Sequence, residues 1–157
     1  MADSVDDLMK RLDDLGGDAL AALEKGLLQA AKLVQGEAKK LAPVNTGELR
    51  ERIFTSVHRD GADLVAEVAA TAPHSVYVEF GTGPEGQKSP KDLPPDVNPT
   101  YRQDGWVYRR EDTGEFVHTE GQPAKPFLYP AFKMHEHELQ GVIADVLMQE
   151  MRKAGQA

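Results

Sequence analysis

The sequence predicts an α+β fold, with an antiparallel β-sheet packed by a long N-terminal helix and a C-terminal helix, and with a long proline-rich loop or hairpin insertion. Near both ends of the chain, apolar residues recur every three or four positions, which is the spacing of an amphipathic helix. Between these stretches they alternate with polar residues, as in half-buried strands. Seven of the ten prolines lie in residues 84–126, so much of that segment cannot be regular helix or central strand.

The composition is that of one soluble globular domain over residues 1–157, with 40% hydrophobic and 28% charged residues. The formal net charge is -8, from 18 basic and 26 acidic residues, which disfavours binding to a phosphate backbone because such binding needs clustered Lys and Arg. The chain has no cysteine, and this excludes disulfides, cysteine-ligated zinc and thiol nucleophiles. No apolar run approaches ~20 residues and the N-terminus is acidic, so we expect synthesis in the cytoplasm and no membrane partner.

Helices are expected over residues 4–42. Ser4 and Asp7 resemble a capping box at the start of a short leading helix, and Asp18 can cap a longer second one. In the second helix, apolar residues alternate by three and four positions, so one face must be buried. Pro43 ends this helix because a proline has no amide hydrogen and disfavours the helical conformation in the residue before it.

Residues 53–83 are expected to form the sheet, after a helical turn through Leu49. Three strands follow from the positions of alternating polarity. The links between them are short and rich in turn residues, so consecutive strands should pair antiparallel. The alternating positions are Ile53, Thr55 and Val57, then Leu64, Ala66, Val68 and Ala70, then Val76, Val78 and Phe80.

Glu79 stands between apolar neighbours in the third of these strands, and two interpretations of it remain open. In a regular strand its side chain shares a face with Tyr77 and not with Phe80. It is then either an exposed sheet position or a charge partner across a subunit boundary. A hydrolytic or metal-dependent enzyme that uses Glu79 and the histidines is a hypothesis of another class.

Residues 84–126 are expected to form an extended insert, and they contain four of the ten aromatic residues. A merely solvated linker has no use for these side chains. Residues 106–110 and 115–118 are expected to be the two strands of a hairpin. This hairpin either packs on its own domain or projects toward a partner. The candidate interface residues are Tyr101, Trp106, Tyr108 and Phe116.

The C-terminal helix is expected over residues 127–153, where apolar residues return to helical spacing. Arg152 and Lys153 stand at its end. Positive charge there suits the helix dipole.

Two further patterns approach known chemical sites without matching them. The stretch Gly81–Ser89 resembles a phosphate-binding loop, but Gln87 separates the last glycine from the lysine. Its glycines are therefore expected where the backbone needs positive φ or close packing. His135 and His137 are two residues apart and point to different sides of a helix, whereas a zinc helix needs histidines four apart. We expect no catalytic residue, no cofactor and no metal.

Three separated segments, residues 41–50, 77–83 and 122–131, together resemble a known family. They read Leu-Ala-Pro-Val-Asn-Thr-Gly-Glu-Leu-Arg, Tyr-Val-Glu-Phe-Gly-Thr-Gly and Gln-Pro-Ala-Lys-Pro-Phe-Leu-Tyr-Pro-Ala. The family is that of phage tail-component proteins, also called tail-completion or head-to-tail joining proteins. Asn45 stands where this family usually has Asp. The residues that match its motifs are Pro43, Thr46, Gly47, Leu49, Tyr77, Glu79, Phe80, Gly81, Thr82, Gly83, Pro123, Pro126, Phe127, Leu128 and Pro130.

The resemblance implies a structural virion protein without enzyme activity or cofactor, made in the host cytoplasm. Such proteins form a ring, commonly of six copies, at the head–tail interface or neck. The ring joins the tail tube to the head connector or stopper and lines the channel, so DNA only passes through it. The alternatives are a head–tail stopper or connector, another minor tail protein, or, ranked below these, a stand-alone soluble binding module.

Overall fold

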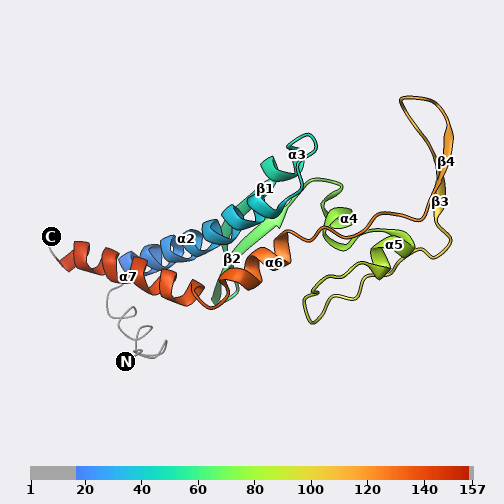
Figure 1. Cartoon of the computed structure of the whole chain (residues 1–157). Coiled ribbons are helices and arrows are strands. Elements are labelled where there is room, and N and C mark those ends of the chain that lie inside the picture. Colours follow the sequence, from blue (N-terminus) through green and yellow to red (C-terminus); the bar gives the residue numbers. More distant parts are fainter. Residues whose placement is uncertain (1–16, 156–157) are drawn as a thin grey trace. The chain divides into compact units, whose positions relative to one another are not determined.

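The computed structural model describes residues 17–155, which combine helices with short strands and so have the expected α+β character (Figure 1). The leading helix expected at Ser4 and Asp7, and the side chain of Asp18, lie outside the described part. The chain divides into two compact units. Among the described residues, unit 1 contains residues 17–34, 55–68 and 135–155, and unit 2 contains residues 35–54 and 69–134. The elements are α2 (Gly17–Leu41), α3 (Glu48–Glu51), β1 (Ile53–Asp60), β2 (Asp63–Ala70), α4 (Ser75–Phe80), α5 (Gly83–Lys88), β3 (Trp106–Arg109), β4 (Phe116–Thr119), α6 (Leu128–His135) and α7 (Leu139–Gly155).

Helix α2 confirms the long helix that the apolar spacing predicts. Its buried positions recur at helical spacing and include Ala30, Val34 and Ala38. The last turn closes with the amide of Ala42 donating to the carbonyl of Ala38 at 2.8 Å, just before Pro43. Small side chains on the buried face let neighbouring segments approach closely.

Unit 1 has a small core in which α2 and α7 pack together. Ala19, Ala22 and Leu147 are buried there, and Leu23 and Ile143 pack against them. The helices approach closely because α2 also carries a glycine, Gly26, where an added Cβ would lie 3.1 Å from the carbonyl oxygen of Ile143.

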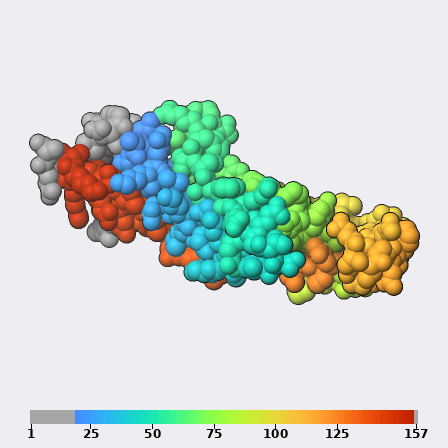
Figure 2. Space-filling model, turned by 90° about the horizontal axis from the view of Figure 1, so that it is seen from above, coloured from blue at the N-terminus to red at the C-terminus, as the bar shows by residue number. Residues whose placement is uncertain are grey.

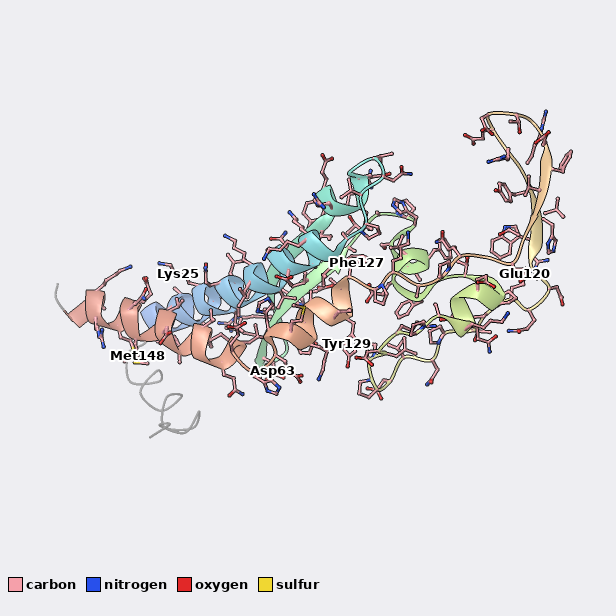
Figure 3. The ribbon with its side chains drawn as sticks, in the orientation of Figure 1. Lys25, Asp63, Glu120, Phe127, Tyr129 and Met148 are labelled. Carbon is pink, nitrogen blue, oxygen red and sulfur yellow. The ribbon has the colours of Figure 1, made fainter. Side chains whose placement is uncertain are left out.

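The surface of unit 1 carries an ion cluster on the same two helices. The ammonium groups of Lys25 and Lys153 lie 2.6 and 2.8 Å from one oxygen of Glu150. Hydrogen bonds from Lys153 and then Lys25 lower the pKa of Glu150 to about 2. Because the group is open to water, solvent screening keeps its contribution to stability small. Figure 3 labels Lys25 on α2 and Met148 on α7.

The expected three-stranded sheet over residues 53–83 is wrong. β1 and β2 form a two-stranded sheet, joined by a turn at Gly61, where φ is 62°. So short a connection requires antiparallel strands. The third predicted strand is instead helix α4. The apolar run is so short that alternation by two does not exclude a helix. The hydrogen bonds between Glu79 and the start of α6 favour the helix.

The single C-terminal helix expected over residues 127–153 is two helices. α6 ends at His135 and α7 begins at Leu139, and the turn between them is closed by the amide of Glu138, which donates to the carbonyl of His135 at 2.9 Å. No glycine or proline marks this break in the sequence, so the apolar spacing did not reveal it. Within residues 17–155 there is no helix long and apolar enough to span a membrane.

Candidate functional site

The three segments that resemble the tail-component family meet in unit 2, and we call their meeting point the junction. It consists of the turn at residues 43–49, helix α4 with residues 81–83, and residues 122–130. Gln122 connects the second and third segments. Its side-chain amide donates to the carbonyl of Tyr77 at 3.2 Å, and its backbone amide donates to the hydroxyl of Thr82 at 3.1 Å. The amide of Thr82 donates to the carbonyl of Gln122 at 2.9 Å, so the two backbones form a short antiparallel bridge.

Glu79 lies at the centre of the junction with only 7% of its surface exposed. One carboxylate oxygen accepts the amides of Phe127 and Leu128 at 2.8 and 3.0 Å, and the other accepts that of Tyr129 at 2.9 Å. These are the amides of the residue before α6 and of the first two residues of α6, which have no partner within the helix. Figure 3 labels Phe127 and Tyr129 where the chain enters α6.

Pro130 leaves no further unpaired amide at the start of α6. The next amide in line after that of Tyr129 would belong to this residue, and a proline has none, so no further acceptor is needed. The negative charge of Glu79 also suits the positive end of the helix dipole. Glu79 is therefore neither an exposed sheet position nor a charge directed to another subunit. Both interpretations assumed a strand where the chain forms α4.

The glycines of the second segment serve close backbone packing, as the sequence indicated. Gly81 has φ of 73° and Gly83 has φ of 61°, in the region that L side chains rarely adopt. A Cβ at Gly81 would lie 2.6 Å from the Cα of Gly86. It would also lie 2.7 Å from the amide nitrogen of Ala124. The chain can leave α4 and touch the third segment only because these side chains are absent.

The turn at residues 43–49 borders the same junction. A cavity of about 720 Å³ is lined by this turn together with Val78, Gln122 and Lys125. Gly47 has φ of 88° at the start of α3, and Leu49 is 4% exposed. The amide of Lys125 donates to the carbonyl of Val78 at 2.8 Å. All three segments thus share one neighbourhood of unit 2.

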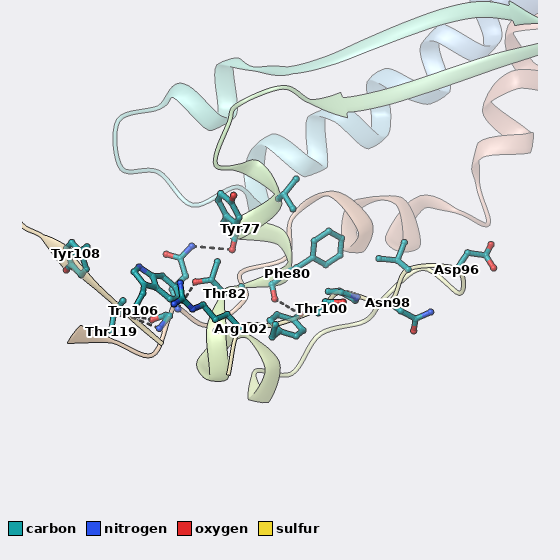
Figure 4. A pocket seen from close by; sticks show the side chains of 18 residues that line it. Tyr77, Phe80, Thr82, Asp96, Asn98, Thr100, Arg102, Trp106, Tyr108 and Thr119 are labelled. Atoms are coloured by element: carbon teal, nitrogen blue, oxygen red, sulfur yellow. Dashed lines mark hydrogen bonds between the residues drawn. The ribbon is translucent and has the colours of Figure 1, made fainter. Parts of the chain in front are cut away.

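A second cavity, the aromatic groove, lies beside the junction and measures about 1110 Å³ (Figure 4). Its aromatic walls come from α4, from the loop after α5 and from β3. Tyr101 is fixed within this wall, because its hydroxyl donates to the carbonyl of Phe80 at 2.9 Å and the ammonium of Lys91 lies 5.1 Å from its ring centroid. The aromatic lining residues are Tyr77, Phe80, Tyr101, Trp106 and Tyr108.

The predicted hairpin in the insert is confirmed as β3 and β4. Its register pairs Trp106 with Thr119, and Arg109 with Phe116. Because side chains alternate along a strand, Trp106 and Tyr108 lie on one face and Phe116 on the other. Phe116 is 77% exposed. Three of the four candidate interface aromatics, Tyr101, Trp106 and Tyr108, therefore line the groove, and the fourth, Phe116, is exposed on the opposite face of the hairpin.

The side chains at the junction bond to backbone groups and do not form a cluster of reactive side chains. Among residues 17–155, no group of three or more His, Asp or Glu side chains is arranged to hold a metal ion. His74 lines the cavity at the turn, whereas His58 lies on β1 and His118 on β4. The role of Gln122 was not predicted from the sequence, although this residue opens the third family-like segment.

Residues 6–81 match a family model described as Bacteriophage HK97-gp10, putative tail-component. The matched stretch contains the first family-like segment and the second as far as Gly81, and it confirms the resemblance to phage tail components. Neither the curated proteins nor the solved structures include a match to this chain.

Proposed function

Since residues 6–81 match a family of phage tail components, we propose that this chain is a structural virion protein of the head–tail interface. Copies of it form a ring, of six subunits, in the neck of the particle. The ring joins the tail tube on one side to the head connector or stopper on the other. No catalytic step belongs to this role.

The observation that carries the proposal is that the motif residues of the second and third family-like segments bond to one another and so join these segments. Glu79 accepts three backbone amides, and Thr82 and Gln122 bond each other through main chain and side chain. Groups engaged in this way hold segments in place. The motif therefore specifies a rigid frame from which other surfaces are presented to partners.

The exposed surfaces outside the junction suit contacts with other subunits. The hairpin β3–β4 exposes Val107 at 60% and Phe116 at 77%, and large apolar side chains at the surface are efficient anchors for partners. Figure 2 shows the hairpin, coloured amber, uncovered on the face in view. The net charge of -8 suits the wall of a channel in which DNA must slide without binding.

A joining experiment tests this proposal. Heads and tails prepared without this chain are mixed with the purified protein, and joined particles are counted by electron microscopy. We expect joined particles only when the protein is added. The mass of protein bound to each isolated tail should correspond to a ring of six copies. An acidic protein of similar size and charge serves as the control.

Two outcomes contradict the proposal. A stable monomer that never adds to tails favours a stand-alone binding module. Addition to isolated heads, with none to tails, places the chain one layer higher, as a stopper or connector.

A further inference from the structure

The aromatic groove has open apolar walls. Val76 is 58% exposed and Tyr77 is 55% exposed, although both line the cavity. Its volume of about 1110 Å³ can hold several side chains. Apolar walls of this kind favour an apolar occupant, because burying them removes surface from water.

Phe116 is an apolar side chain that could occupy such a groove. It belongs to a paired strand, so its position is defined, yet it is 77% exposed. Val107 lies on the same face of the hairpin and is 60% exposed. An ordered aromatic residue that is this exposed, next to a second exposed apolar residue, is typical of a contact with a partner.

A chain cannot place Phe116 in its own groove. The groove is lined by Trp106 and Tyr108, which lie on one face of the hairpin. Phe116 pairs with Arg109 and therefore lies on the opposite face. If Phe116 enters such a groove, the groove belongs to another molecule, and a second copy of this chain offers one.

The charges of the groove and the hairpin tip are complementary. Arg102 lines the groove and, within the described part of the chain, forms no ion pair. Figure 4 shows it toward the Trp106 end, whereas Asp96, the acid of the lining, lies at the opposite end. The tip next to Phe116 is acidic. Its acids are Glu111, Asp112 and Glu115.

The arginines of the hairpin are held by the tip itself, and Arg110 offsets the charge of Asp112. The guanidinium of Arg109 donates to the carbonyl of Gly114 at 3.1 Å, and that of Arg110 lies 3.8 Å from Asp112. Glu111 is exposed, and among the described residues no such contact holds it. It is the acid of the tip that is best placed to meet Arg102 of another copy.

We propose that the hairpin tip of one copy docks in the aromatic groove of the next, with Phe116 against Tyr77 and Trp106 and with Glu111 against Arg102. This inference rests on the proposed ring. The contact joins two different surfaces, so it repeats head to tail and can close a ring. One hairpin tip buries far less than the ~1,200 Å² of a stable pair, so the contact acts together with others around the ring.

Cross-linking tests the proposal, since the natural chain has no cysteine. A Phe116→Cys protein is mixed with a Val76→Cys protein and treated with a short thiol–thiol cross-linker. The control partner is Val44→Cys, because Val44 is 59% exposed and lies outside the groove. We expect about tenfold more heterodimer with Val76→Cys than with Val44→Cys, as for an interface centred on one buried aromatic anchor.

A charge-reversal pair gives a second measurement. Arg102→Glu in the Val76→Cys protein should lower the yield of heterodimer, and Glu111→Lys in the Phe116→Cys protein should restore it. Equal yields with Val44→Cys, no heterodimer, or a dominant Phe116→Cys homodimer would each overturn the proposed docking. Failure of the reversal to restore the yield would overturn the pairing of Arg102 with Glu111.

The joining experiment separates this inference from the function on which it rests. If the wild-type protein joins heads to tails but the heterodimer is absent, the docking is wrong and the proposed function stands. If the wild-type protein does not join them, the proposed function fails whatever the cross-linking gives.

Discussion

Glu79→Ala is expected to lower the free energy of unfolding by roughly 3–5 kcal/mol, because each buried amide left without an acceptor costs about 1–3 kcal/mol. The carboxylate accepts the amides of Phe127, Leu128 and Tyr129, all within 3.0 Å. The substitution removes the acceptor of all three together. It also leaves an empty space at the centre of the junction, where Glu79 is 7% exposed.

Urea denaturation followed by circular dichroism measures this loss as a lower midpoint with an unchanged slope. Glu79→Gln keeps one acceptor oxygen and should give an intermediate loss. Glu85→Ala is the matched control, since Glu85 is a surface acid whose partner Lys88 lies 3.9 Å away, and it should change stability by less than about 0.5 kcal/mol. Equal midpoints for Glu79→Ala and Glu85→Ala would show that the carboxylate does not hold the junction together.

Gly81→Ala is expected to have the second largest effect, lowering the free energy of unfolding by about 3 kcal/mol or more. A side chain at this position destabilises the protein by about 1–3 kcal/mol through its positive φ, and by a similar amount through overpacking. The Cβ would lie within 2.8 Å of backbone atoms of Gly86, Ala124 and Gln122. Backbone atoms cannot rotate away as the end of a long side chain can. The second and third segments must therefore separate.

Gly36→Ala is the control for this change. Gly36 lies within α2, and an added Cβ there meets nothing within 4 Å, so alanine should raise stability by about 0.5–1 kcal/mol. Trp106, the only tryptophan of the chain, lines the aromatic groove next to the junction, so its fluorescence reports whether Gly81→Ala opens that groove. A Gly81→Ala protein as stable as Gly36→Ala, with unchanged emission, would contradict the close packing.

The parts of the fold that the sequence predicted are those set by local patterns. Helix α2 follows from a long apolar repeat and from Pro43, and the hairpin β3–β4 follows from two short runs around turn residues. Helix α4 was mistaken for a strand because its six residues satisfy alternation by two, while its helical form depends on partners of Glu79 that lie 48–50 residues further along the chain. Contacts at such separation leave no periodic signal.

The candidate site was predictable in its residues but not in its mechanism. All three segments were found from the sequence, and the structure shows that they bind one another. Their pairing through Gln122, and the use of Glu79 as an acceptor for α6, required the structure. The four aromatic residues of the insert were identified together, yet their surroundings differ. Tyr101 is bonded to Phe80 from a loop, whereas strand register places Phe116 on the exposed face of the hairpin.

The central claim is that this chain forms a structural ring between head and tail. A cryo-electron microscopy map of the assembled particle tests it most directly, because such a map gives the layer, the copy number and the contacts together. We predict a closed ring of this chain between the connector or stopper and the tail tube, with each hairpin tip in the groove of the next subunit. A neck built without this chain, or the chain located elsewhere in the particle, would contradict the claim.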